Sequence, residues 1–264
     1  MLVWPSFREA GVPLFSRLIW WLGPCLQALI LFRGFRCRTL LKYPYFNAYV
    51  ASGCLGTVFL FVYYVWTRDL GLYLKAYWII QFCTLLIGCG IVLEIFRHIL
   101  GPYPGADKFA TIVVLATFGV IFCFALTYQF FVPEWATSKG SAPEIERNVR
   151  TVQAIFLFVI LAVISYYRIP IGKNLKGMIT GYGLYIVSSL FTLAVAAYAG
   201  PRFNSTWNVI QPFSFDLSIA IWVVALWSYH PSPAPDPNVP LGRDYDAFAA
   251  KTRRALSAMW PRIH

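Results

Sequence analysis

Seven apolar stretches, each long enough to cross a bilayer, account for most of this 264-residue chain. A membrane-spanning helix needs about 20 apolar residues to cross a hydrocarbon core of about 30 Å. Backbone N–H and C=O groups find no water partners in lipid, so such stretches fold as helices. The sequence therefore predicts an all-α membrane protein, a seven-transmembrane-helix bundle. We place the spans at 14–34, 45–66, 76–97, 109–131, 149–167, 177–199 and 207–229.

The composition leaves little room for a soluble domain. Hydrophobic residues make up 59% of the chain and charged residues 12%, about half the charged share of a typical soluble protein. We therefore divide the chain into an N-terminal external segment (1–13), a transmembrane domain (14–229) and a cytoplasmic tail (230–264). The tail begins with a proline-rich spacer and continues into a predicted amphipathic helix at about 244–259, suited to the inner leaflet or to a partner.

The distribution of lysine and arginine predicts the orientation of the bundle. The larger share of the 22 basic residues falls in the loops after the first, third and fifth spans and in the tail. Basic residues accumulate on the cytoplasmic side, so we expect the N-terminus outside and the C-terminus in the cytoplasm, in a bacterial inner membrane. The formal charge of +11 is spread beside the spans, where it meets anionic lipid headgroups, and this pattern argues against nucleic-acid binding.

The sequence offers little that points to catalysis. It contains no HExxH, P-loop, GxSxG or CxxC motif. Paired haem ligation inside the bundle lacks a second histidine, because His230 and His264 lie at or beyond the cytoplasmic boundary. The six cysteines show no metal-ligand spacing and none falls in an external loop. We therefore expect no enzyme activity, no metal and no cofactor.

Polar residues inside apolar spans are the strongest indicators of a site, because each is costly in lipid unless it is paired. Glu94 and His98 lie four apart at the cytoplasmic end of the third span, with Arg97 beside them. These three are candidates for a proton relay, a ligand site or an interfacial ion pair, and the pattern favours the ion pair.

A second group of polar residues points to the outer half of the bundle. Arg150 and Gln153 share one face of the fifth span, and Asn208, Gln211 and Asp216 lie on the seventh, which Pro212 interrupts. A proline frees a backbone carbonyl, a device found where helices line cavities. We predict a polar ligand-binding pocket in which Asp216 or Gln211 faces Arg150 or Gln153.

Three segments carry a resemblance to a known group of proteins: LEIFRH at 93–98, PYP at 102–104 and ERNVRTVQ at 146–153. Together they resemble a group of uncharacterised seven-span inner-membrane proteins of acidobacteria-like bacteria. The similarity extends over nearly the whole chain and implies fold and location, but no activity. The chain is also loosely similar to the seven-helix sensory modules that precede bacterial kinase or cyclase domains, although it carries no such domain.

Three functions fit these features. The first is a receptor-like or accessory protein that binds a small ligand in the outer half or docks with another membrane protein or a second copy. The second is a small transporter or channel, because spans 1–3 and 5–7 have the same orientation and allow a three-plus-three repeat around the fourth span. The third is a structural subunit of a larger membrane complex.

Overall fold

The computed structural model describes residues 14–37, 40–67, 69–131, 142–199, 204–230, 233–234 and 239–259. These residues form eight α-helices and no sheet, so the predicted all-α class is confirmed. One helix coincides with each predicted span, although α7 ends three residues before the predicted end of the seventh, and an eighth covers the predicted tail helix, beginning three residues earlier than expected. The helices are α1 (Leu14–Arg36), α2 (Pro44–Thr67), α3 (Leu70–Leu100), α4 (Pro104–Phe131), α5 (Ala142–Tyr167), α6 (Lys173–Ala199), α7 (Asn204–Leu226) and α8 (Leu241–Met259).

Five of these helices are long and apolar enough to cross a bilayer: α2, α3, α4, α5 and α6. In α7 the described apolar stretch is shorter, at Ile210–Leu226. Helix α1 is not among these five. The predicted lipid bilayer environment therefore fits this helical architecture, with five candidate spans among the described residues.

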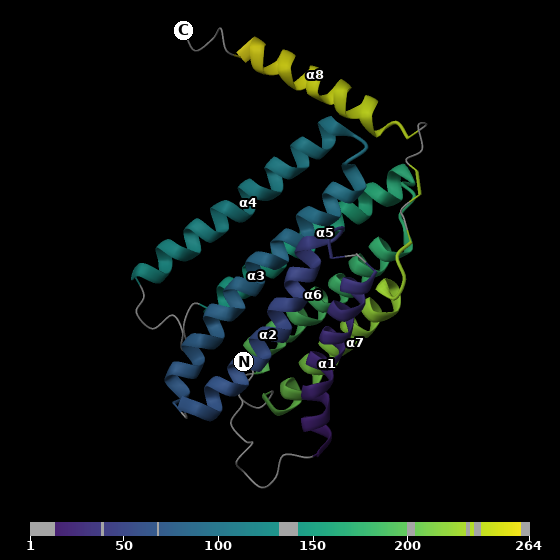
Figure 1. Cartoon of the computed structure of the whole chain (residues 1–264). Helices are drawn as coiled ribbons and strands as arrows, with labels where there is room; N and C mark the ends of the chain where they lie inside the picture. The colour runs from purple at the N-terminus through teal and green to yellow at the C-terminus, as the bar shows by residue number, and fades with distance from the viewer. Residues whose placement is uncertain are drawn as a thin grey trace.

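Six helices close a ring, and the remaining two lie outside it (Figure 1). Around the ring the order is α1, α2, α3, α5, α6 and α7, with α7 returning to contact α1. Helix α4 packs on the outside against α3 and α5, and α8 crosses the end of the bundle against α4. We call the end of the bundle beside α8 the α8 end, and the opposite half the cavity half.

Small residues in α3 and α6 let neighbouring helices approach closely. A Cβ added at Gly177 would lie 2.0 Å from Ala225 Cβ, and one added at Gly181 would lie 2.3 Å from Trp222 Nε1. A Cβ at Gly88 would lie 2.6 Å from the Tyr182 hydroxyl. These distances are far shorter than van der Waals contact, so the α6–α7 and α3–α6 interfaces require glycine at these positions.

At the α8 end, side chains cap the exposed backbone groups of helix ends. Asn174 Nδ2 donates to the carbonyls of Ala225 (3.0 Å) and Ser228 (2.9 Å), and the His230 N–H donates to Asn174 Oδ1 (2.6 Å). The Arg33 guanidinium donates to the Trp227 carbonyl at 3.0 Å. The last carbonyls of a helix have no partner within the helix, so these contacts satisfy the C-terminus of α7.

Helix α8 is attached to the bundle through its first turn. The Tyr245 ring covers Gly105 at the start of α4 and lies 6.2 Å from the Phe109 ring. The Tyr167 hydroxyl donates to Asp244 Oδ2 at 3.0 Å, which joins α8 to the end of α5. Phe248 and Lys251 are exposed, as a helix at a membrane surface or partner interface requires.

Candidate functional site

A cavity of about 180 Å³ lies in the cavity half and is lined by residues of α1, α2, α3, α6 and α7. Three of these helices, α2, α3 and α7, present one face to it, with lining residues spaced three or four apart, as neighbours on a helix face are. The lining residues are Gly23, Pro24, Tyr49, Ser52, Gly53, Gly56, Thr57, Leu60, Tyr73, Tyr77, Ile80, Gln81, Thr84, Tyr185, Gln211, Pro212, Phe215 and Asp216. The cavity thus includes the polar segment of α7 that the sequence singled out.

Asp216 and Gln211 supply the polar groups of α7 to the cavity wall. Asp216 is 8% exposed, and its Oδ2 atom has no hydrogen-bond partner among the described residues. Gln211 Oε1 is also buried and unpartnered there. Gly23 on α1 makes room for the carboxylate, because a Cβ at that position would lie 2.9 Å from Asp216 Oδ1. The wall therefore carries two buried oxygens that are free to accept hydrogen bonds.

Aromatic rings form much of the remaining wall. Tyr49 from α2, Tyr73 and Tyr77 from α3, and Tyr185 from α6 line the cavity together with Phe215 from α7. The Tyr185 and Phe215 rings lie 5.2 Å apart between centroids, and Tyr49 and Tyr185 lie 6.4 Å apart at 63°. Such edge-on contacts fix the orientation of the rings.

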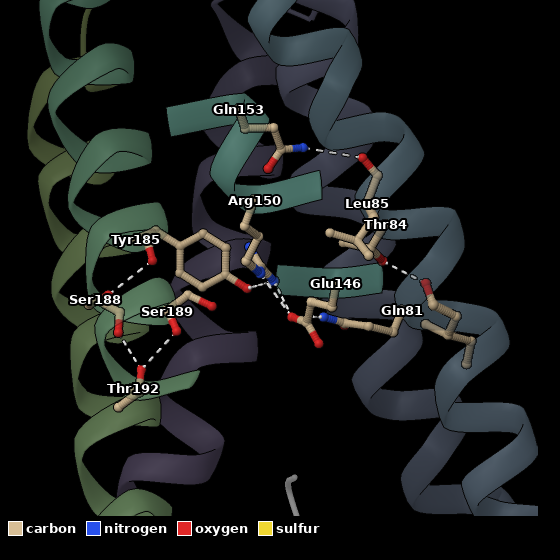
Figure 2. Close-up of polar contacts among 11 residues, drawn as sticks. Gln81, Thr84, Leu85, Glu146, Arg150, Gln153, Tyr185, Ser188, Ser189 and Thr192 are labelled. Carbon is tan, nitrogen blue, oxygen red and sulfur yellow. Dashed lines mark hydrogen bonds and ion pairs between the residues drawn. The ribbon is translucent and has the colours of Figure 1, made fainter. Parts of the chain in front are cut away.

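A buried ion pair stands immediately behind this wall (Figure 2). Arg150 on α5 is 3% exposed, and it lies 2.8 Å from Glu146, one turn earlier on the same helix. Its Nη2 atom also donates to the Tyr185 hydroxyl at 2.9 Å, and the Gln81 amide donates to Glu146 Oε1 at 2.8 Å. Tyr185 and Gln81 both line the cavity, so the ion pair holds two wall residues in place.

The structure brings together only part of the predicted pocket. Gln211 and Asp216 line the cavity, whereas Arg150 lies behind the wall. Of the contacts that the prediction allowed, an ion pair between Arg150 and Asp216 is not formed among the described residues, and the guanidinium is bonded to Glu146 on its own helix. The side chain of Asn208 lies outside the residues whose side chains the structure describes.

Gln153, the remaining predicted residue, occupies a separate layer between α5 and α3. Its amide Nε2 contacts the Leu85 carbonyl and Cys89 Sγ, each at 3.5 Å, and its Oε1 has no partner among the described atoms. The Tyr182 hydroxyl donates to the Gly88 carbonyl nearby at 2.9 Å. Gln153 therefore links helices and is not part of the cavity wall.

The candidates Glu94, Arg97 and His98 do not form the expected ion pair within the described structure. Glu94 instead accepts the backbone N–H groups of Tyr45 (3.3 Å) and Phe46 (2.9 Å), the first turn of α2. A carboxylate at a helix N-terminus satisfies free N–H groups and interacts favourably with the helix dipole. Arg97 is exposed, and His98 Nδ1 bonds the Glu94 carbonyl on its own helix.

The loop before α2 completes this cap. The Tyr43 ring is buried and lies 4.9 Å from the His98 ring between centroids. Burial, helped by the neighbouring Tyr229 hydroxyl and the Glu94 carboxylate, raises the pKa of Tyr43 to about 12. The phenol is therefore neutral at physiological pH, and this cluster has the features of a structural joint between α2 and α3.

Sequence reasoning missed the tyrosines of α3 and the role of Glu146. Tyr73, Tyr77 and Gln81 recur every four residues, the spacing of one helix face, which was the available signal. Glu146 stands four residues before Arg150, a spacing that favours an ion pair within one helix.

The described residues contain no group of three His, Cys, Asp or Glu side chains that could hold a metal ion. No protein-family model, curated protein or solved structure matches the chain. The function must therefore be inferred from the cavity and its own residues.

Proposed function

We propose that this chain is a seven-span inner-membrane protein of receptor-like or accessory type, which binds a small ligand in the cavity. In this proposal α1 and α7 add to the five long apolar helices, the N-terminus is outside, and the α8 end faces the cytoplasm. The basic residues gathered in the loops and tail at the α8 end support this orientation. The cavity then opens toward the outer half of the membrane.

The unpartnered Asp216 carboxylate carries the proposal. A buried polar group without a partner is destabilising, by roughly 1–3 kcal/mol for a neutral group and more for a charge. Ionisable residues inside membrane bundles therefore mark ligand or ion sites by default. Asp216 lies in the wall of a cavity large enough for a small molecule, beside a second free acceptor on Gln211. A ligand in the cavity would supply the missing partners.

A small transporter is the second candidate, and the order of the helices favours it. Helices α1 to α3 and α5 to α7 close the ring, while α4 lies outside between them. This is the arrangement expected of two three-helix units joined by a linker helix, with a site at their interface. The cavity contacts helices of both units. A transporter would move its ligand into sealed liposomes, whereas a receptor would bind the ligand without moving it.

Native mass spectrometry of the protein released gently from its own membrane tests the proposal. We expect a bound small molecule on the wild type and on Val58→Trp, and its loss from Thr57→Trp. Thr57 lines the cavity, whereas its neighbour Val58 is 45% exposed on the outer face of α2. A small molecule that survives Thr57→Trp would contradict the proposal. A stoichiometric protein partner without any ligand would instead indicate a structural subunit.

A further inference from the structure

We infer that the ligand of the cavity is a small organic ammonium ion, with Asp216 as its counter-ion. This inference deepens the proposed function and depends on it. It follows from three features of the cavity: the sign of its unpaired charge, the chemistry of its walls and its volume.

The unpaired charge of the cavity is negative. Within the described structure no Lys or Arg lies within ion-pair distance of Asp216, and the nearby Arg150 is already held by Glu146. The opposite charges of Arg150 and Glu146 offset one another, so Asp216 determines the sign of the net charge at the cavity. The other free atom, Gln211 Oε1, is also an acceptor. Both groups require a donor or a positive charge, and the lining residues include no Lys or Arg to balance the charge of an anionic ligand.

The walls suit a cation with apolar substituents. Ammonium groups are attracted to the faces of aromatic rings, and cages of such rings recognise quaternary ammonium ions. Four tyrosines and Phe215 line this cavity, and an acid completes the set. One ring already makes such a contact, because the Arg150 guanidinium lies 4.7 Å from the centroid of Tyr185. Tyr49, Tyr73 and Tyr77 surround the same space.

The volume limits the size of the ion. A cavity of about 150 Å³ holds one benzene molecule, and this one measures about 180 Å³. A bare metal ion would leave most of the space empty and would lack oxygen ligands beyond those of α7 and the hydroxyls. An amino acid or peptide would bring a carboxylate, for which the wall offers no free cation. An ion the size of choline fits both the volume and the charge.

Choline and its neutral isostere, the alcohol in which a tert-butyl group replaces trimethylammonium, provide the test. They match in shape and differ in charge, so titration calorimetry of each reports the effect of charge alone. The protein is kept in dodecyl maltoside, because phosphatidylcholine would supply competing headgroups. We expect choline to bind roughly tenfold or more tighter than the isostere. Asp216→Asn should remove this preference, while Asp246→Asn, which removes an exposed acid on α8, should keep it.

A second variant, at the aromatic wall residue Tyr77, keeps the test independent of how well Asp216→Asn folds. Tyr77→Leu should weaken choline binding more than isostere binding, whereas Tyr77→Phe, which keeps the aromatic face, should weaken choline binding less than Tyr77→Leu does. Equal binding of choline and the isostere would overturn the ammonium inference and leave the proposed function standing. If choline fails to bind while native mass spectrometry still finds a retained small molecule, the ammonium inference is likewise overturned and the proposed function stands. Failure to bind choline with no retained molecule would overturn both.

Discussion

Glu94 and Asn174 at the α8 end differ from Asp216 and Gln211 in the cavity half in whether their buried polar atoms have hydrogen-bond partners. At the α8 end, Glu94 receives two backbone N–H groups and Asn174 is bonded to three backbone groups around the end of α7. In the cavity half, Asp216 and Gln211 each leave a buried oxygen without a partner in the described structure. Glu94 and Asn174 therefore stabilise the fold, whereas the unpartnered oxygens of Asp216 and Gln211 cost stability and remain available to a ligand.

The ion pair of Arg150 and Glu146 lies in the cavity half, but its two charged groups have partners within the protein, as Glu94 and Asn174 do at the α8 end. Both charges are buried and paired, and removal of one leaves the other unsatisfied. The comparison thus separates two kinds of acid within one half: Glu146 has its partner inside the protein, and Asp216 does not. Three substitutions test this separation, and a fourth tests the close packing of α6 against α7.

Arg150→Ala should have the largest effect. Breaking a buried pair by removing one partner costs about 3–5 kcal/mol, because the remaining charge is uncompensated. Denaturant unfolding in detergent should show this loss, and the second substitution Glu146→Gln should recover a large part of it. Adding Asp216→Asn to Arg150→Ala should instead give additive effects. Rescue by Asp216→Asn would show that Asp216, and not Glu146, is the partner of Arg150.

Glu94→Ala should destabilise the protein by about 1–3 kcal/mol, because the N–H groups of Tyr45 and Phe46 would lose their acceptor. Glu94→Gln keeps one oxygen on the same stem and should cost less. Thermal unfolding in detergent would rank the two variants. Equal losses for both would mean that the contacts of the side chain stem, and not the cap, account for the effect.

Gly177→Ala should cost about 1–3 kcal/mol through overpacking of α6 against α7. The added methyl would stand 2.0 Å from Ala225 Cβ, so Ala225→Gly should restore part of the stability. Gly119→Ala on α4 is the matched control, since a Cβ there meets nothing within 4 Å. The unfolding midpoint should fall for Gly177→Ala and should stay the same or rise for Gly119→Ala. A similar fall at both positions would remove close packing as the cause.

The sequence predicted helices well and their rotations poorly, for one physical reason. Lipid is as apolar as the interior of the bundle, so hydrophobic periodicity does not separate an inward face from an outward one. Tyr77 and Gln81 therefore went unassigned although their spacing marks a single face. Asp216 and Gln211 were identified because polar groups within an apolar run stand out whatever the rotation. The partner of Arg150 could not be predicted without knowing how α5 is rotated. In the structure the guanidinium binds Glu146, one turn earlier on the same helix.

Asp216→Asn should have the smallest effect on stability, and the sign of the change in the free energy of unfolding is informative. In ligand-free protein the carboxylate lacks a cation within the described structure, so neutralising it removes a cost and breaks no pair. We expect the free energy of unfolding to stay within about 0.5 kcal/mol of the wild type or to increase. Glu94→Gln, the same chemical change at the α8 end, should lower it. Denaturant unfolding of both variants without ligand makes the comparison directly. A loss at Asp216 as large as that at Glu94 would mean that the carboxylate is structural, and the contrast between the two halves would then fail.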